Sequence, residues 1–527
     1  MAASAIETDR TERWHYLSLS AVAVLLSTTA LAYYYHSGAI LLYGDAVAHI
    51  NIARRVFDSR TPGWFQLGTV WLPLPHLLEI PFISNDWLWR SGVGASLPSM
   101  LAYIAGTLGV FRLVRGLASR GAAWIAALIY ALNPNLLYLE ATAMGEALYL
   151  ALFVWTLVFF SEFAREAREQ PQRARVSLER CGLALSASML VRYDAWFFAP
   201  VLSLAVLMVA EKQSMVPGPI RRGIVNFLLL GSLTAALWLA YNRAAYGNAL
   251  EFATGPYSAH AIQERSRTPT FPSYPGEGSP RTAALYFLKV SRLNLGQGPA
   301  ASLLFMVAFV ALLSAIYFSR KFLPWTLLWI PVVFYTLSIS WGSVPIYFPD
   351  WYPFSYYNVR YGLQTLPAVA VFVGVGYELL SKFIPARVAA LGTAAVVIAS
   401  YGLVGRSIPI CLREAEANGR ARMEFDHRLA SELGKLPASA TLMMDCGAHS
   451  GAIQEAGIHF RRVLRESNPP YWEIALTQPA QSADYIIAFP GDDVSRAVHL
   501  FPAGLEPVAR VDAPQGLRAV IYRSVHE

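Results

Sequence analysis

The chain has 527 residues, of which 55% are hydrophobic and only 15% are charged. This balance excludes an ordinary water-soluble protein and predicts a polytopic membrane protein with much of its surface in lipid. The net charge of +7 does not indicate a nucleic-acid partner, because the basic residues gather in short loops between apolar runs, where they set membrane orientation. Cys181, Cys411 and Cys446 have neither zinc-site nor disulfide-framework spacing.

Apolar stretches of roughly the length needed to cross a bilayer predict about eleven transmembrane helices. They are residues 17–38, 92–111, 121–139, 147–160, 181–191, 195–210, 224–241, 300–318, 322–339, 363–380 and 388–404. Before the first stretch, acidic residues offset Arg10 and Arg13, which is unlike a cleaved signal peptide. We therefore expect an uncleaved first span.

Arginine-rich and lysine-rich loops alternate with loops of mixed charge. The basic loops are residues 112–120, 165–180, 212–222, 320–321 and 382–387. By the positive-inside rule these five loops face the cytoplasm, so the N-terminus is cytoplasmic and the C-terminal segment lies outside. Within this scheme residues 181–210, interrupted by "RYDAW", form a short hairpin that places Arg192 and Asp194 at the outer surface.

The chain divides into a transmembrane domain, residues 1–406, and an outer domain, residues 407–527. In the second part a helical stretch precedes short β-like runs, "TLMMD", "DYIIAF" and "RAVIY", which predict a small soluble α/β domain. Two outer loops stand out, residues 43–90 and 246–298. The latter is rich in Gly, Pro and Ser and is either a lid or acceptor-binding loop or a disordered linker.

The first outer loop opens with "LLYGDAVAHINIARRVF". Apolar and polar residues fall on opposite arcs of a helix that would lie along the membrane surface. Asp45, at its start, is either a helix cap or a functional acid. His49 lies one turn later on the same face, and the loop continues through "GTVWLPLPHLLE", which adds His76 and Glu79.

These motifs resemble the GT-C membrane glycosyltransferases, especially the protein mannosyltransferase and aminoarabinose transferase branch and its bacterial members. The resemblance rests on "YGDAVAHINIARRVF", "NPNLLYLEATAMGEAL", "LVRYDAW" and "YYNVRYGLQTLPA", and on their order and sidedness. Asp45 matches the family's first-loop acid, and Glu146 matches its second-loop acidic position. Glu140 and Glu146 replace the DxD of oligosaccharyltransferases, and the paired Asp-Glu of eukaryotic mannosyltransferases is missing, so a dedicated metal site is not implied.

The resemblance implies an all-α, GT-C-like membrane domain that moves a sugar from a polyprenyl-phosphate donor to a protein, lipid or glycan acceptor. Transfer would occur on the periplasmic face of a bacterial inner membrane and would invert the anomeric carbon. The chemistry needs a base, for which we predict Asp45 with Glu146 second, and cations for the phosphate. Further candidates for substrate binding are His49, Arg192, Asp194, Arg243, Lys289, Arg292, Tyr357 and Arg360.

Several alternatives remain open at this stage. Each arginine is also explained as an interfacial anchor, and the aromatic run "IYFPDWYPFSYY" is either a sugar platform or part of an aromatic belt. A divalent cation, Mg or Mn, could bridge acid and phosphate, with His49, His76, Glu79 or His260 as ligands. A transporter or flippase of lipid-linked sugars and a non-catalytic envelope scaffold are the rival functions; the gathering of charges at one face, with no visible repeat, favours the enzyme.

Overall fold

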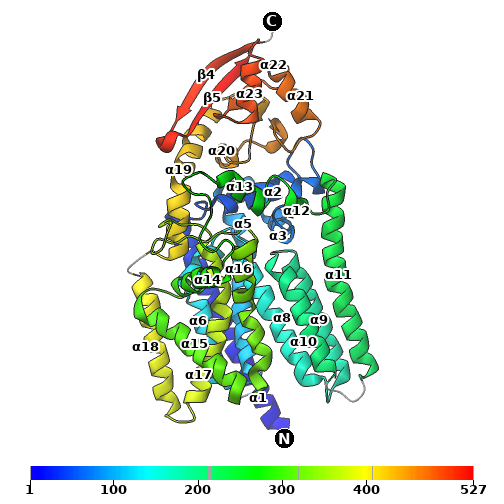
Figure 1. Cartoon of the computed structure of the whole chain (residues 1–527), viewed down its shortest axis with the longest axis vertical. Helices are drawn as coiled ribbons and strands as arrows, with labels where there is room; N and C mark the ends of the chain where they lie inside the picture. The colour runs from blue at the N-terminus through cyan, green and yellow to red at the C-terminus, as the bar shows by residue number, and fades with distance from the viewer. Residues whose placement is uncertain (1, 212–215, 319, 406–407, 526–527) are drawn as a thin grey trace.

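The computed structural model describes residues 2–211, 216–318, 320–405 and 408–525. Long helices run side by side along the length of the molecule, and a small sheet lies beyond one end of them (Figure 1). Short helices form a layer between the two parts, which we call the loop layer. It contains α2 (Gly44–Arg55), η1 (Trp64–Leu67), α3 (Leu74–Ile83), α4 (Asp86–Ser91), α12 (Glu251–Thr254) and α13 (Ala259–Ser266).

Eight helices of the described chain are long and apolar enough to cross a membrane, so this is a multi-pass membrane protein. They are residues Glu12–His36 of α1 (Ala2–His36), α5 (Val93–Arg115), α8 (Glu146–Glu166), α10 (Asp194–Glu211), α11 (Gly218–Tyr246), α15 (Gly298–Phe318), the combined η2 (Arg320–Trp329) and α16 (Ile330–Trp341), and the combined η3 (Val359–Thr365) and α17 (Leu366–Leu380). A ninth candidate is the pair α6 (Arg120–Ala131) and α7 (Pro134–Glu140), which is bent by 60°.

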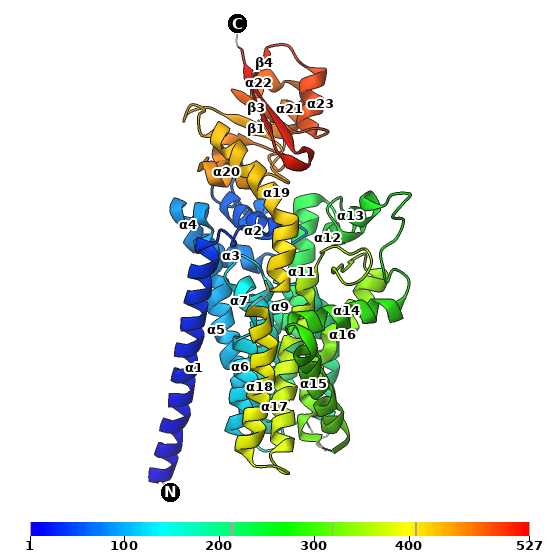
Figure 2. The ribbon, with the colours of Figure 1, turned by 90° about the vertical axis from the view of Figure 1, so that its left-hand side faces the viewer.

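The expected count of about eleven is therefore too high by these criteria. The two remaining stretches form α9 (Pro171–Met189) and α18 (Ala386–Gly405). The first half of α9 carries Arg173, Arg175, Glu179 and Arg180, and the apolar part of α18 is short. Both helices nevertheless run alongside the bundle, α9 next to α8 and α11 and α18 next to α15 (Figures 1 and 2).

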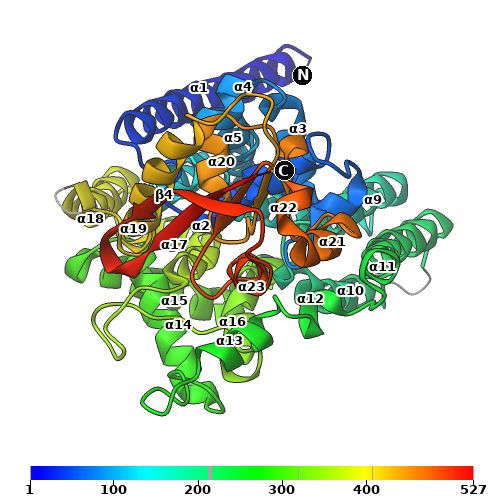
Figure 3. The ribbon, with the colours of Figure 1, turned by 90° about the horizontal axis from the view of Figure 1, so that it is seen from above.

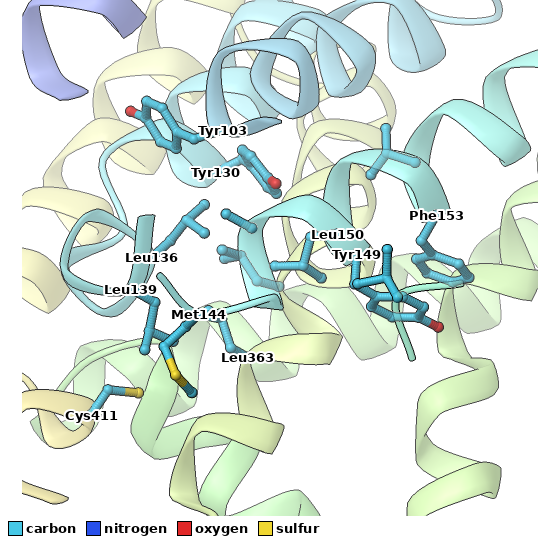
Figure 4. Packing of buried hydrophobic residues seen from close by; sticks show 14 of the residues in the cluster. Tyr103, Tyr130, Leu136, Leu139, Met144, Tyr149, Leu150, Phe153, Leu363 and Cys411 are labelled. Atoms are coloured by element: carbon cyan, nitrogen blue, oxygen red, sulfur yellow. The ribbon is translucent and has the colours of Figure 1, made fainter. Parts of the chain in front are cut away.

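Small residues allow the central helices to approach closely. A Cβ atom on Gly374 of α17 would lie 2.8 Å from the carbonyl oxygen of Ala122 on α6. Aromatic and aliphatic side chains fill the space around α5, α7 and α8, including Tyr103, Tyr130 and Tyr149 (Figure 4). Because α7 and α8 are anchored in this core, the start of α8 has a fixed position.

The C-terminal part is a five-stranded mixed sheet with order β2-β1-β3-β5-β4. β1 (Leu442–Met444) pairs in parallel with β2 (Val463–Leu464) and β3 (Tyr485–Ala488), whereas β5 (Arg518–Ser524) runs antiparallel to β3 and β4 (Leu505–Asp512). The accompanying helices are α20 (Ser450–Ala456), η4 (Phe460–Arg462), α21 (Tyr471–Thr477), α22 (Pro479–Ser482), α23 (Asp493–Leu500) and η5 (Pro514–Gly516). The predicted fold class, an all-α membrane protein with a small C-terminal α/β part, is confirmed.

One helix connects the two parts of the molecule, and another packs among the membrane helices. α19 (Ile410–Leu433) descends from the sheet to the long helices (Figure 2), while α14 (Pro280–Asn294) packs on η3 and α16. Seen from above, the sheet and its helices lie over α2 (Figure 3). The residues that precede and begin α2 are therefore enclosed between the membrane helices and the C-terminal part.

The polar arc that the sequence predicts for α2 faces other segments of the protein. Asn51 is buried, donates to the side chain of Gln454 on α20 at 3.0 Å, and accepts the indole N–H of Trp89 at 3.0 Å. Arg54 is buried too, and its guanidinium contacts Asp58 at 2.9 Å and Asp86 at 2.7 Å. Protein groups, instead of water, thus satisfy Asn51 and Arg54 on this arc.

Candidate active site

Three carboxylates that are far apart in the sequence stand at the starts of helices that converge below the C-terminal part. Asp45 is in the first turn of α2, Glu146 begins α8 and Asp194 begins α10. Negative side chains are favourable at these positions because helix N-termini carry partial positive charge. At the described start of α2, however, Tyr43 occupies the N-cap position without a side-chain cap, and the Asp45 carboxylate contacts an arginine instead.

That arginine is Arg360, in η3 at the start of a membrane helix. One Nη atom lies 2.5 Å from Asp45 Oδ2, and its Nε lies 3.2 Å from Glu146 Oε1. The Arg360 side chain is 10% exposed, and the Glu146 side chain is 2% exposed. Asp45 is 35% exposed, which makes it the accessible end of this chain of charges.

The chain continues from Glu146 to a second arginine. Arg192, between α9 and α10, lies 3.2 Å from Glu146 Oε1 and 3.3 Å from Asp194 Oδ2. It also donates to the hydroxyl of Tyr335 at 2.8 Å, and that hydroxyl donates to Asp194 at 2.7 Å. Three acids and two arginines thus form one continuous cluster, which we call the acid-arginine cluster.

Tyrosine rings support both guanidinium groups. Tyr361 lies 4.8 Å from the guanidinium carbon of Arg192 and 5.2 Å from that of Arg360, measured to the ring centroid. Tyr43 contacts Arg360 in the same way at 5.2 Å. These cation-π contacts fix the two arginines in orientation.

One oxygen of the cluster is left over. Glu146 Oε2 is buried and has no hydrogen-bond partner among the described residues. A buried carboxylate oxygen without a donor is costly. The Oε2 atom of Glu146 can therefore accept a further hydrogen bond.

His49 and His76 form a buried pair beside the cluster. Their Nδ1 and Nε2 atoms are 2.7 Å apart, and His49 packs at 5.0 Å against the ring of Trp71. Burial lowers the pKa of His49 to about 4, Asp45 and Glu146 oppose this shift, and Arg360 and Arg192 add to it. Burial also lowers the pKa of His76, so both histidines are neutral at pH 7, and burial raises the pKa of Glu79.

Comparisons with known proteins agree with this architecture. Residues 89–238 match the family of dolichyl-phosphate-mannose-protein mannosyltransferases. The structure is similar to that of ArnT from Cupriavidus metallidurans in the apo state, with a TM-score of 0.61 and 14% identity over 97% of this chain and 98% of that chain. No curated protein matches the sequence.

Two further structures share the fold. ArnT from the same organism bound to undecaprenyl phosphate has a TM-score of 0.60 and 13% identity, covering 96% of this chain and 99% of that one. The Archaeoglobus fulgidus oligosaccharyltransferase in complex with Zn and sulfate has a TM-score of 0.50 and 10% identity, covering 95% and 72%. The resemblance seen in the sequence motifs is confirmed. The chain thus shares its fold with ArnT and with this oligosaccharyltransferase, and residues 89–238 match the mannosyltransferase family.

The structure brings together five of the residues singled out from the sequence: Asp45, Glu146, Arg192, Asp194 and Arg360. His49 lies near them. Tyr357, 41% exposed, stacks at a tilt on Tyr347 with centroids 5.7 Å apart and lies close enough to Asp45 and Arg360 for their charges to affect it.

Other predicted residues have their described contacts outside the cluster. Arg243 bonds to the carbonyl of Gly247, and Arg292 contacts the backbone of Gly298 and the hydroxyl of Ser302. Lys289 pairs with Asp350 at 3.0 Å, and His260 contacts Ser343. The geometry gives these four residues no place beside Asp45.

Two tyrosines that contact the cluster were not predicted. Tyr335 lies in an apolar stretch and Tyr361 just before one, where a tyrosine is indistinguishable from a packing residue until its hydroxyl or ring is seen against an arginine. Glu414 of α19 was also missed. It is buried, accepts from the Tyr43 hydroxyl at 2.7 Å, and burial raises its pKa.

Proposed function

We propose that the protein moves a sugar from a polyprenyl-phosphate donor to an acceptor hydroxyl on the periplasmic side of a bacterial inner membrane, with inversion and with Asp45 as the base. The single observation that carries the proposal is the acid-arginine cluster. It joins the start of α2 to the ends of three membrane helices, and its most exposed carboxylate belongs to Asp45. The sidedness follows from the basic loops of the sequence.

Arg360 and Arg192 are the proposed phosphate ligands. Their planar, permanently charged guanidinium groups suit a phosphate that gains negative charge as the sugar leaves. The similar fold of ArnT binds undecaprenyl phosphate, which supports a lipid phosphate as the donor's anchor. Both arginines are already paired with acids, so their charge is compensated before the donor arrives.

This pairing suggests how donor binding prepares the base. As described, Asp45 Oδ2 is bound to Arg360 Nη2. A donor phosphate that takes this edge of Arg360 would release Asp45, whose carboxylate then accepts the proton of the acceptor hydroxyl. The hydroxyl oxygen attacks the anomeric carbon from the face opposite the phosphate, the sugar-phosphate bond breaks, and the lipid phosphate leaves.

The remaining site residues receive supporting roles. Glu146 lies between both arginines and holds them in place, and its unpaired Oε2 can accept from a sugar hydroxyl. Tyr357 and Tyr347 offer ring faces for the sugar. Neutral His49 contributes a hydrogen bond and no charge.

The histidines do not fit a metal site. Two nitrogen ligands on one tetrahedral zinc ion are about 3.3 Å apart, given Zn–N distances near 2.0 Å, whereas His49 and His76 contact each other directly at 2.7 Å. Across the part of the chain that the structure describes, no three His, Cys, Asp or Glu side chains are arranged to hold an ion. We derive no step through a metal.

Replacing Asp45 with Asn tests the proposal. We expect sugar transfer from the polyprenyl-phosphate fraction of the parent strain to fall by about 100-fold or more, because general-base catalysis typically contributes that much. Mass spectrometry of lipid-linked sugars that accumulate in a deletion strain identifies the donor to be labelled.

Asp86→Asn is the matched control for this experiment. Asp86 lies in the same loop region and also pairs with an arginine, but through Arg54, away from the cluster. It should keep transfer within a few-fold of the parent. If a folded Asp45→Asn protein transfers sugar at the parental rate, Asp45 is not the base.

A further inference from the structure

A cavity of about 650 Å³, lined by none of the residues of the acid-arginine cluster, lies between the C-terminal end of α1 and helices α2, α4, α19 and α20. Small-molecule sites typically enclose about 300–1,000 Å³, so the space is large enough for a ligand. The proposed transfer reaction does not use it, since Asp45 does not line it.

The cavity is amphipathic. Its apolar walls come from Tyr35, Ile40, Leu41, Val47 and Met423. Tyr35 belongs to the last turn of the first membrane span, Glu12–His36, so the apolar side of the cavity adjoins the bilayer boundary. An occupant with an apolar tail could extend from this wall into lipid.

Three arginines form the cationic side of the cavity. Arg90 is exposed, and its described hydrogen bond goes to a backbone carbonyl, that of Glu455, at 2.8 Å. Arg422 bonds to Asp426 at 2.8 Å and to the Leu41 carbonyl at 2.9 Å, while its buried Nε has no partner within the described chain. Arg420, 67% exposed and paired with Glu416, adds a third guanidinium whose remaining donors face solvent.

Three acids balance these three arginines. Asp426 is paired with Arg422, whereas Glu424 and Glu455 are half-exposed and are contacted by Arg428 and His427 at the surface. A purely anionic ligand would meet the carboxylates as well as the arginines. A ligand that carries one negative and one positive group fits both.

We propose that this cavity binds a membrane phospholipid with a zwitterionic phosphoethanolamine headgroup. The phosphate lies against Arg90 and Arg420, beside Arg422, the ammonium group lies against Glu424 or Glu455, and the glycerol and upper acyl chains contact the apolar wall. Because Arg422 binds the carbonyls of Leu41 and Leu42, four and three residues before Asp45, the lipid would stabilise the segment that positions the proposed base.

Lipid retention by the full-length protein tests the proposal directly, without reference to sugar transfer. The protein is purified in nanodiscs that contain equal amounts of phosphatidylethanolamine and phosphatidylglycerol, released, and analysed by native mass spectrometry. We expect at least tenfold more bound phosphatidylethanolamine than phosphatidylglycerol. Equal retention of the two lipids would overturn the assignment.

Three variants locate the site. R90Q combined with R420Q removes two phosphate ligands and should reduce retained phosphatidylethanolamine about tenfold. M423W fills the apolar wall without changing charge and should do the same. R496Q is the matched control, because Arg496 is an exposed residue of α23 that does not line the cavity. This variant should retain the parental amount of lipid.

The named outcomes separate the alternatives. Parental retention by both cavity variants would refute the site, whether or not Asp45 proves to be the base. Excess glycerophosphoethanolamine, which is the headgroup without acyl chains, should not displace the lipid. Full displacement would show that the apolar wall does not contribute and would refute a lipid as the ligand.

Discussion

Burial and charge oppose each other at His49. Burial lowers the pKa of this imidazole to about 4, against an ordinary value near 6.5, despite the nearby carboxylates of Asp45 and Glu146. Between these two values the unfolded chain binds more protons than the folded chain. The free energy of unfolding contributed by His49 is therefore complete above pH 6.5 and decreases as the pH falls toward 4.

This sign gives a measurable prediction. From pH 7 to pH 5 the His49 contribution should decrease by about 2 kcal/mol, as two-state linkage requires for such a shift. We expect the free energy of unfolding of His49→Gln, measured by thermal unfolding across this range, to lack the decrease that His49 causes. The decrease that His76 causes should remain. His499 lies at the exposed end of α23, so His499→Gln is the control and should have the pH dependence of the parent. If His49→Gln also keeps the parental pH dependence, His49 is not buried in its neutral form.

At the scale of single residues, the sequence indicates how close an arginine lies to the membrane boundary but not which way its side chain faces. Arg192 and Arg360 adjoin apolar stretches of the sequence, and Arg243 also follows one closely. Only the first pair faces the cluster. The pattern along one helix indicates how deep a residue lies, but which side faces the site depends on the packing of neighbouring helices.

Single helices show where periodicity succeeds and fails. The apolar and polar arcs of α2 were visible in the sequence, yet the polar arc is buried against residues about 400 positions away. An amphipathic pattern predicts that one face of the helix needs polar partners. It does not predict whether water or another segment of the protein provides them. Likewise α9 was recognised as apolar only in its second half, because arginines occupy the first.

The contact between α19 and the segment before α2 supplies an element-scale prediction. A Cβ atom on Gly419 would lie 2.0 Å from the carbonyl oxygen of Leu42, so no side chain fits without moving one of the two. Gly419→Ala should lower stability by about 1–3 kcal/mol, as overpacking commonly does, and should reduce sugar transfer because Asp45 follows Leu42 by three residues. Thermal unfolding and transfer assays on the same preparation measure both.

Gly434→Ala, at the end of the same helix, is the control. The nearest atom to its added Cβ is 3.3 Å away, so the substitution requires little movement. It should leave transfer at the parental level. Normal stability and transfer in Gly419→Ala would mean that the close approach of α19 does not position the start of α2.

At the scale of the whole molecule, a sheet covers the site at the ends of the membrane helices. The sheet part contacts the loop layer through buried side chains: Asn51 bonds to Gln454, whose amide N–H donates to the Trp89 carbonyl at 2.9 Å. Arg54 reaches His459 of the same part. The C-terminal part thus replaces water over α2 and fixes the helix that begins with Asp45.

The division into residues 1–406 and 407–527 stays a prediction, and these contacts indicate that the two parts do not act independently. The long loop, residues 246–298, contains α12 and α13, and it bonds to the end of α16 through Tyr274 and Ile339 at 2.7 Å and through Gly278 and Ser340 at 2.9 Å. These bonds favour an ordered loop over a disordered linker. The sequence indicated its length and composition but could not reveal its anchoring points.

A double-mutant cycle between Asn51 and Gln454 tests whether the two parts are energetically coupled. Asn51→Ala and Gln454→Ala should each lower the free energy of unfolding by about 1–3 kcal/mol, because each leaves buried polar partners unsatisfied. Their combination should cost less than the sum, since the second change removes a group that has already lost its partner. Both single variants should also reduce sugar transfer although neither residue contacts the acid-arginine cluster. Strict additivity, together with parental transfer, would mean that the C-terminal part covers α2 without positioning Asp45.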